Sequence, residues 1–271
     1  AMVHCRRLPK GLLFEISRIQ HLLPTLGIVA LSKSEEREHR YSSLRDVSRL
    51  GIVTGMRSET ACLESVPIHI NDKYNLSFCA GGNPGRAYAG AEYLLRHGAD
   101  ALVSFGIAGA LEPTLTPGHI ILAKSVIDGT GEQFQTDEAW YHALTQALAP
   151  NVDFTCGTIA TMEKAATTAS EKAALFARTG ALAVDMESSG VAAVATRHKI
   201  PFIAIRSIAD PASRKLPIAV LKGLAPDGTS RPLAVLLELM LRPWELPGLM
   251  RLGRDSSTAL AGLRRVAALG F

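Results

Sequence analysis

Acidic residues stand at the ends of two neighbouring apolar segments in the second half of the chain. Asp185 and Glu187 directly follow one short apolar run, and Asp210 ends the β-branched run 201–208. The small residues of 188–198 lie between the two runs and predict a helix, so the segment is typical of a strand-helix-strand unit. Because ligands of open α/β sheets bind beyond the carboxyl ends of the strands, we expect Glu187 and Asp210 to face one crevice.

The order of residues around these acids also resembles a known signature. Asp185-Met186-Glu187, the alanine-rich helix and Ile205-Arg206-Ser207-Ile208-Ala209-Asp210 together resemble the purine nucleoside phosphorylase/uridine phosphorylase superfamily. The resemblance covers roughly residues 50–210. It is nearest to the methylthioadenosine/adenosylhomocysteine nucleosidases and to the hopanoid-associated phosphorylases, the enzymes implicated in removing adenine from adenosylhopane. The tail after Gly228 resembles the hopanoid branch.

The resemblance implies an enzyme that cleaves the N-glycosidic bond of an adenosine-type nucleoside, during which positive charge builds on the sugar and negative charge on the leaving base. Asp210 would be the general acid toward purine N7, a role that requires a pKa raised by burial or by neighbouring carboxylates. Glu187 would accept hydrogen bonds from the ribose hydroxyls, Met186 would pack against the ribose face, and Arg206 would pair with an acid of the scaffold. The alternatives are a helix-capping Asp210, a solvated Glu187 and a Met186 in ordinary core packing.

A further candidate acid lies near the start of the resemblance. Residues 50–54 predict a strand, and the turn that follows places Ser58 and Glu59 at a helix N-terminus, where the helix dipole favours a negative side chain. In the nucleosidase branch the first strand is likewise followed by Met and, three residues later, by a catalytic Glu; Met56 and Glu59 occupy these places. A carboxylate near C1′ can orient and deprotonate a water, whereas it would repel phosphate. A purely structural acid at the helix start remains the alternative for Glu59.

Gly106-Ile107-Ala108-Gly109 predicts a sharp turn after an apolar strand. Small residues let backbone N–H groups approach a ligand, so Gly106 and Ile107 are predicted to bind substrate. Phosphorylases of the superfamily commonly have Arg, and three residues later a phosphate-binding Ser, in this turn. This chain has Ser104 and Ile107 there, and the departure weakens the prediction of phosphorolysis.

Two arginines are the remaining candidates for binding phosphate. Arg57 and Arg86 both lie near predicted helix starts, where anions bind readily, although surface arginines are the alternative. No cofactor is expected other than phosphate as a co-substrate. Whether the acceptor is water or phosphate therefore stays open.

The predicted elements are those of an α/β protein. Strands are predicted over residues 50–54, 74–80, 101–105, 119–126 and 154–161, helices over 81–96 and 137–148 and within 163–179, and a loop over 128–136. The resemblance implies a single domain with a central mixed β-sheet flanked by helices. We expect residues 1–49 to be a peripheral extension, 50–228 the nucleoside phosphorylase-like domain, and 229–271 a helical tail packed on that domain.

The tail combines apolar and basic residues. Helices are predicted over 232–241 and 256–269, separated by Pro243-Trp244 and Pro247-Gly248. Five arginines lie among Leu and Met, which makes the tail basic and amphipathic. Such a surface can rest on anionic lipid, and a helix that packs its apolar face on the domain is the simpler alternative.

Composition excludes several classes of protein. The 271 residues are 47% hydrophobic, enough for one sizeable core, and the net charge of +4 is interspersed rather than gathered into the stripe of a nucleic-acid binder. The four cysteines and the histidines lack metal-site spacing, so no metal is expected. No apolar run reaches the ~18 residues of a spanning helix. We expect a cytoplasmic homo-oligomer with its tail packed on the domain; contact of the tail with the inner face of the membrane is the alternative.

Three rival functions follow. A methylthioadenosine/adenosylhomocysteine nucleosidase is the alternative within the same enzyme class, and a non-catalytic nucleoside-binding protein would bind adenine without turnover. A nucleotide-dependent oxidoreductase is disfavoured because the glycines of 81–85 lack the G-x-G-x-x-G spacing and the strand ending at Phe105 lacks the ribose-binding acid.

Overall fold

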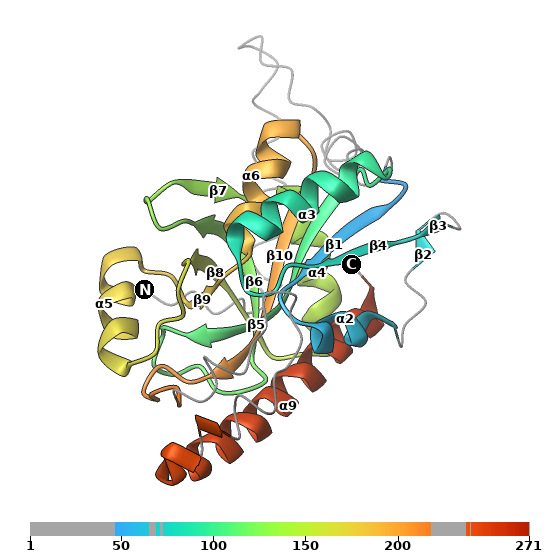
Figure 1. Cartoon of the computed structure of the whole chain (residues 1–271). Helices are drawn as coiled ribbons and strands as arrows, with labels where there is room; N and C mark the ends of the chain where they lie inside the picture. The colour runs from blue at the N-terminus through green and yellow to red at the C-terminus, as the bar shows by residue number, and fades with distance from the viewer. Residues whose placement is uncertain (1–46, 65–68, 71–72, 218–236, 239, 271) are drawn as a thin grey trace, which may run out of the picture.

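The computed structural model describes residues 47–64, 69–70, 73–217, 237–238 and 240–270, and these form strands and helices around a central sheet (Figure 1). The strands are β1 (Leu50–Thr54), β2 (His69–Ile70), β3 (Lys73–Tyr74), β4 (Leu76–Cys79), β5 (Ala101–Ala110), β6 (Ile120–Ile127), β7 (Gln133–Gln135), β8 (Phe154–Thr161), β9 (Ala183–Asp185) and β10 (Phe202–Asp210). The helices are α2 (Arg57–Glu64), α3 (Pro84–Arg96), α4 (Glu138–Leu148), α5 (Ala169–Thr179), α6 (Ser188–His198), the 3₁₀ turn η2 (Pro243–Glu245) and α9 (Leu246–Leu269). Residues 1–46 of the predicted N-terminal extension lie outside the described residues.

The main sheet is mixed and partly closed. Its strand order is β10-β6-β8-β9-β5-β1-β4, with β7 paired to β6, and β10 also pairs with β5. Five strands, β10, β6, β8, β9 and β5, therefore form a ring, from which β1 and β4 extend. β5 is parallel to β1 and β10 and antiparallel to β9. This arrangement confirms the predicted α/β class with a central mixed sheet flanked by helices.

Helices cover both faces of the sheet. On one face α3 and α6 share a core that includes Leu94 and Val191, and on the other face α2, α4 and α9 share a core that includes Trp140 and Leu263. The start of α6 lies directly against the start of α3, because a Cβ at Gly190 would overlap the backbone of Pro84. This close approach fixes the beginning of α6, where Glu187 stands.

The sharp turn predicted at residues 106–109 is wrong, because β5 continues to Ala110. In the register of β10, Arg206 lies opposite Gly106 and Asp210 opposite Gly109, while β9 pairs with Gly109 from the other side. Strands that are distant in the sequence thus hold the glycine-rich segment extended. Gly106 leaves room for the carboxylate of Glu59, whereas a Cβ at Gly109 would make only ordinary contacts.

Two smaller predictions also need correction. The loop predicted over 128–136 contains β7, which pairs with β6 after a turn closed by the carboxylate of Asp128. The break predicted at Pro247-Gly248 is absent, because Pro247 stands in the first turn of α9, where no backbone N–H is needed. The helix predicted over 232–241 lies mainly outside the described residues. Among those described, no helix is both long and apolar enough to cross a bilayer.

Candidate active site

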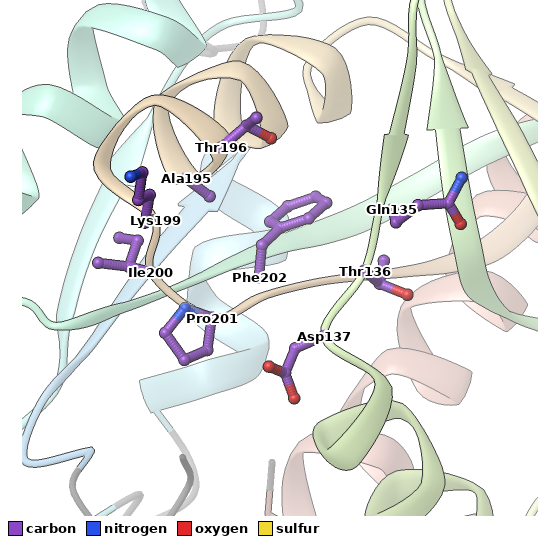
Figure 2. Close-up of a pocket in the computed structure, with 9 residues that line it drawn as sticks. All are labelled: Gln135, Thr136, Asp137, Ala195, Thr196, Lys199, Ile200, Pro201 and Phe202. Carbon is purple, nitrogen blue, oxygen red and sulfur yellow. The ribbon is translucent and has the colours of Figure 1, made fainter.

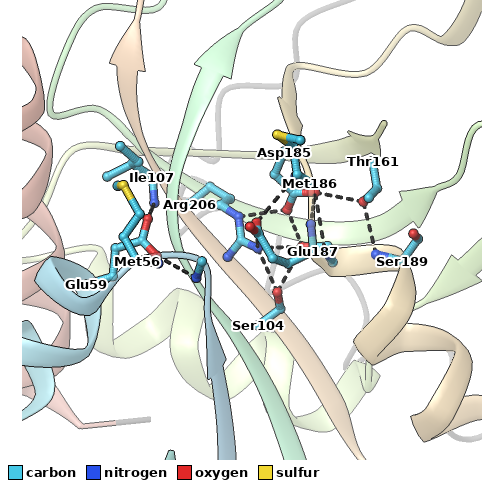
Figure 3. A network of polar contacts seen from close by, with 12 residues as sticks. Met56, Glu59, Ser104, Ile107, Thr161, Asp185, Met186, Glu187, Ser189 and Arg206 are labelled. Carbon is cyan, nitrogen blue, oxygen red and sulfur yellow. Dashed lines mark hydrogen bonds and ion pairs between the residues drawn. The ribbon is translucent and has the colours of Figure 1, made fainter. Parts of the chain in front are cut away.

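A buried arginine organises one end of the sheet. Arg206, in the middle of β10, is 1% exposed, and its Nε donates to Asp185 Oδ2 at 2.7 Å (Figure 3). Its Nη2 donates to Ser104 Oγ at 2.7 Å and to Ser188 Oγ at 3.0 Å, and its Nη1 donates to the carbonyl of Ile205 at 2.9 Å. The predicted pairing of Arg206 with a scaffold acid is therefore confirmed.

Asp185 connects this arginine to the start of α6. Its Oδ1 accepts from the Thr161 hydroxyl at 2.7 Å and from the backbone N–H groups of Glu187 and Ser188, each at 3.3 Å. Removing one member of such a buried ion pair typically costs about 3–5 kcal/mol, because the partner charge is left uncompensated. Asp185 thus acts as a scaffold residue that aims the segment carrying Glu187.

Glu187 is buried at the start of α6. Its Oε2 lies 3.8 Å from Arg206 Nη2, and its carboxyl group packs against Gly55, where a Cβ would overlap it. Burial, helped by the charge of Asp185, raises the pKa of Glu187 to about 8, although Arg206 opposes the rise. This rise favours the protonated form of Glu187, which can donate as well as accept a hydrogen bond.

Glu59 reaches the same place from the first turn of α2. Its Oε2 accepts from the N–H groups of Gly55 at 2.7 Å and Met56 at 2.8 Å, and its Oε1 accepts from the N–H of Ile107 at 2.8 Å. A Cβ at Gly106 would come within 2.8 Å of its carboxylate, so a larger residue there would displace the Glu59 side chain. Burial raises the pKa of Glu59, and the bond from Ile107 is the largest opposing effect. Glu59 thus closes the helix start and lies beside Glu187, and its role in catalysis stays a prediction.

Asp210 ends β10, where it lies opposite Gly109 of β5 and takes part in a separate ion pair. Its Oδ2 accepts from Lys172 Nζ, and its buried Oδ1 has no hydrogen-bond partner among the described residues. Burial raises the pKa of Asp210, while Lys172 and then Arg214 oppose the rise. Gly109, opposite Asp210, is three residues from Gly106, which corresponds to about 10 Å along the strand. One end of the sheet therefore carries two acid positions, with Glu59 and Glu187 at one and Asp210 at the other.

Residues 76–239 match the Phosphorylase superfamily, which is more than half of the chain. The chain belongs to the Phosphorylase superfamily. Membership confirms the predicted superfamily and an enzyme of the nucleosidase and phosphorylase class.

Several solved structures are similar in fold to this chain. A 5′-methylthioadenosine/S-adenosylhomocysteine nucleosidase from Neisseria meningitidis, in complex with methylthio-immucillin-A, has a TM-score of 0.64 at 16% identity, over 82% of this chain and 98% of that one. The corresponding nucleosidase from Colwellia psychrerythraea, in complex with adenine, has a TM-score of 0.61 at 18% identity, over 83% and 96%. A futalosine hydrolase from Helicobacter pylori has a TM-score of 0.53 at 20% identity, over 60% and 89%. At these identities the similarity concerns the fold.

Lys172, which contacts Asp210, was not among the site residues predicted from the sequence. It stands in the first turns of α5, and its spacing to Leu175 and Phe176 places it on the helix's apolar stripe. A lysine within an apolar stripe is a signal that can be recognised before the fold is known. The usual expectation of a solvated lysine concealed it.

The other predicted residues fall into two groups. Met56, Met186 and Ile107 lie around the acids in Figure 3, next to Glu59 and Glu187. Arg57 and Arg86 are exposed at the starts of α2 and α3, which follow the paired strands β1 and β4. Arg86 Nε donates to the carbonyl of Ala80 at 2.8 Å. Phosphate binding by these two arginines stays a prediction. Within the described ranges, no group of three or more His, Cys, Asp or Glu side chains could hold a metal ion.

A pocket of about 310 Å³ opens elsewhere, beside the beginning of β10 (Figure 2). It is lined by Gln135 to Asp137, by Ala195 and Thr196, and by Lys199 to Phe202. Phe202 begins β10 and Asp210 ends it, so the pocket and Asp210 stand about 25 Å apart along one strand. None of the acids described above lines this pocket, and we place the candidate active site at the carboxyl end of β10.

Proposed function

We propose that this enzyme cleaves the N-glycosidic bond of an adenosine-type nucleoside and releases adenine. The observation that carries the proposal is the pair of acid positions beside β5. Glu59 and Glu187 lie at one, and Asp210, whose buried Oδ1 has no partner among the described residues, lies at the other. The superfamily supports glycosidic cleavage, and structures of the same fold hold adenine or an immucillin.

The two positions match the two halves of the reaction. Positive charge that develops on the sugar is stabilised by the Glu59 carboxylate near Gly106, and Glu187 hydrogen-bonds the ribose hydroxyls. Asp210, with its pKa raised by burial, donates a proton to the departing purine. Met186, adjacent to Glu187, covers the ribose face in this assignment.

Water is the acceptor that the geometry favours. The Ile107 N–H, which could have bound an anion, donates to Glu59, and Ser104 is held in the Arg206 network. A phosphate at this place would meet the Glu59 carboxylate and would depend on Arg57 and Arg86 for compensation. We therefore propose hydrolysis, with phosphorolysis as the alternative.

The finer proposal for the substrate is a nucleoside joined to a lipid, adenosylhopane in particular. Six large apolar side chains lie exposed at the beginning of α9 and just before it, and we call this set the tail patch: Leu237, Met240, Leu241, Trp244, Leu246 and Met250. Met240 and Trp244 are 74% and 73% exposed. Clusters of exposed apolar side chains mark interaction sites.

The charges near the tail patch suit an anionic lipid surface. Two acids stand between these apolar residues in the sequence, and both form ion pairs with Arg242. The distance from Arg242 Nε to Glu238 Oε1 is 3.4 Å, and that from Nη1 to Glu245 Oε1 is 3.9 Å. Arg251 and Arg254 are exposed in the next turn, and Arg254 shares the outward face of α9 with Met250 at i,i+4 spacing. Apolar side chains flanked by arginines are typical of helices that lie in a membrane interface.

The same helix contacts the loop that follows Asp210. Arg214 forms an ion pair with Asp255 of α9, and Gly248 lies beside Pro217. A membrane-bound tail patch would therefore hold this loop near the lipid from which the substrate comes. This connection supports a lipid-linked nucleoside over methylthioadenosine.

A substrate panel tests the proposed reaction. Adenine release is measured by chromatography with adenosylhopane, methylthioadenosine and adenosylhomocysteine, each with and without phosphate. We expect release without phosphate, and the highest kcat/KM for adenosylhopane. No release from any adenosine derivative by a folded sample overturns the proposal, whereas preference for methylthioadenosine replaces only the lipid-linked substrate.

Vesicle binding tests the tail patch. The protein should sediment with phosphatidylcholine vesicles that contain phosphatidylglycerol and stay in the supernatant with phosphatidylcholine alone. Trp244→Glu should weaken binding at least about tenfold, since it removes a large apolar group and adds a charge repelled by the surface. The matched control is Leu269→Glu, at the far end of the same helix. Equal binding by all three proteins contradicts the prediction. So does a dimer in gel filtration whose interface covers the tail patch.

A further inference from the structure

Lys172 has an environment that few lysines have. Its side chain is 0% exposed, and its ammonium group donates to Asp210 Oδ2, to the carbonyl of Pro211 at 2.9 Å and to the carbonyl of Arg214 at 2.9 Å. These three bonds occupy all three donors of the ammonium group. Lys172 therefore has no donor left for a ligand and can affect one only through Asp210.

Burying an ammonium group costs free energy that an apolar side chain of similar volume would not cost. The same position in α5 could have held Met or Leu, as Leu175 does one turn later. Helix α5 is already fixed by a capping box between Thr168 and Glu171. The helix start thus has its own stabilisation, and the buried charge calls for another explanation.

The two oxygens of Asp210 have different surroundings. Oδ2 is held by Lys172, while Oδ1 is buried without a partner among the residues that the structure describes. Among the residues that the structure describes, the other cation that affects Asp210 is Arg214, whose guanidinium is paired with Asp255 of α9. Lys172 is therefore the cation in direct contact with Asp210, and Oδ1 is the oxygen left for a ligand.

We propose that Lys172 is a positioning residue that stabilises the carboxylate which Asp210 becomes when it gives its proton to the leaving base. The inference rests on the proposed function. The C1′–N9 bond breaks with its electron pair on the purine, and the proton on Oδ1 moves to the purine. The resulting carboxylate faces the ammonium group through Oδ2. Water adds its hydroxyl to C1′ and gives its proton to Glu59.

The pH dependence follows from the sign of this interaction. Asp210 must be protonated to act, so activity falls on the alkaline side as the free acid ionises. A cation within hydrogen-bond distance lowers the pKa of a carboxyl by about 1–3 units. Without Lys172 the acid is weaker, which moves the alkaline limb to higher pH and slows proton transfer.

The experiment compares Lys172→Met with the wild-type enzyme over a range of pH. We expect kcat to fall at least about tenfold and the alkaline limb to move up by about 1–3 pH units. Leu175→Ala, which disturbs the same helix without touching Asp210, should lower the melting temperature and leave the limb in place. An unchanged limb with unchanged kcat in folded Lys172→Met overturns the proposal.

A double mutant separates the electrostatic role from a structural one. In an Asp210→Asn background, Lys172→Met should have little further effect on kcat, whereas a structural role predicts the full additional loss. If Lys172→Met does not fold, Lys172→Gln is measured instead, because its amide still donates to the carbonyls of the loop.

A measurement without substrate keeps this inference distinct from the proposed function. The Asp210 carboxyl is followed by ¹³C NMR titration of the selectively labelled protein, with Asp210→Asn giving the assignment. Its pKa should rise by about 1–3 units in Lys172→Met even if no nucleoside is turned over. An unchanged titration rejects the role of Lys172, whereas a shifted titration with no adenine release rejects only the reaction.

Discussion

Replacing Asp210 with Asn is expected to lower kcat for adenine release by about 10²–10⁴-fold, the usual contribution of a general acid. The amide has nearly the shape of the carboxyl group, but it cannot deliver a proton to the leaving purine. The measurement is single-turnover adenine release, made well below the melting temperature, because the variant also leaves the buried Lys172 ammonium without a counter-charge.

The control for this variant is Asp255→Asn. Asp255 is a partly buried acid that forms an ion pair with Arg214 in the loop after Asp210. Its replacement disturbs that loop but leaves the proton donor in place, so the loss should be far smaller. Undiminished release by folded Asp210→Asn would show that the purine leaves without help from this residue.

The second large effect concerns Glu59. Glu59→Gln should reduce phosphate-free adenine release by about 10²–10⁴-fold if Glu59 is the base that activates water. The amide keeps one acceptor oxygen, so at least one of the bonds from Gly55, Met56 and Ile107 is lost, at about 1–3 kcal/mol of stability. Rates and melting temperatures are measured together to separate the two losses.

Glu112→Gln is the matched control for Glu59→Gln. Glu112 is a buried acid whose carboxylate accepts hydrogen bonds from the backbone N–H and the hydroxyl of Thr114. It should lower the melting temperature with little change in rate. If wild-type activity requires phosphate absolutely, Glu59 is not a water activator and phosphorolysis replaces hydrolysis in the proposal.

Elements with strong local patterns could be predicted from the sequence. Helix α6 has the predicted bounds, and β1 and β8 coincide with the predicted strands, because apolar periodicity and strand-end acids are properties of adjacent residues. The extension of β5 through Ala110 could not be predicted, since its hydrogen bonds come from β9 and β10, about 75 to 100 residues later. Backbone pairing of this kind leaves no pattern in the segment itself.

The candidate site was predictable in part for the same reason. The family motif supplied Glu59, Glu187 and Asp210, and the structure brings the first two together beside Gly55 and Gly106. The Arg206 network draws on β5, β9, β10 and α6, and the residue in contact with Asp210 comes from α5. Contacts between such distant segments depend on the folded topology, so Lys172 could be suspected only from its place in an apolar stripe.

The ring of β5, β9, β8, β6 and β10 limits how the molecule can respond to a substrate. Every strand of the ring has a neighbour on each side, so none can slide or peel away without breaking hydrogen bonds along two edges at once. The acids at the ends of β9 and β10 therefore sit on a nearly rigid frame. Any adjustment that admits a bulky nucleoside must come from the segments joined to the ring, such as the loop after Asp210 and the helix to which Arg214 ties it.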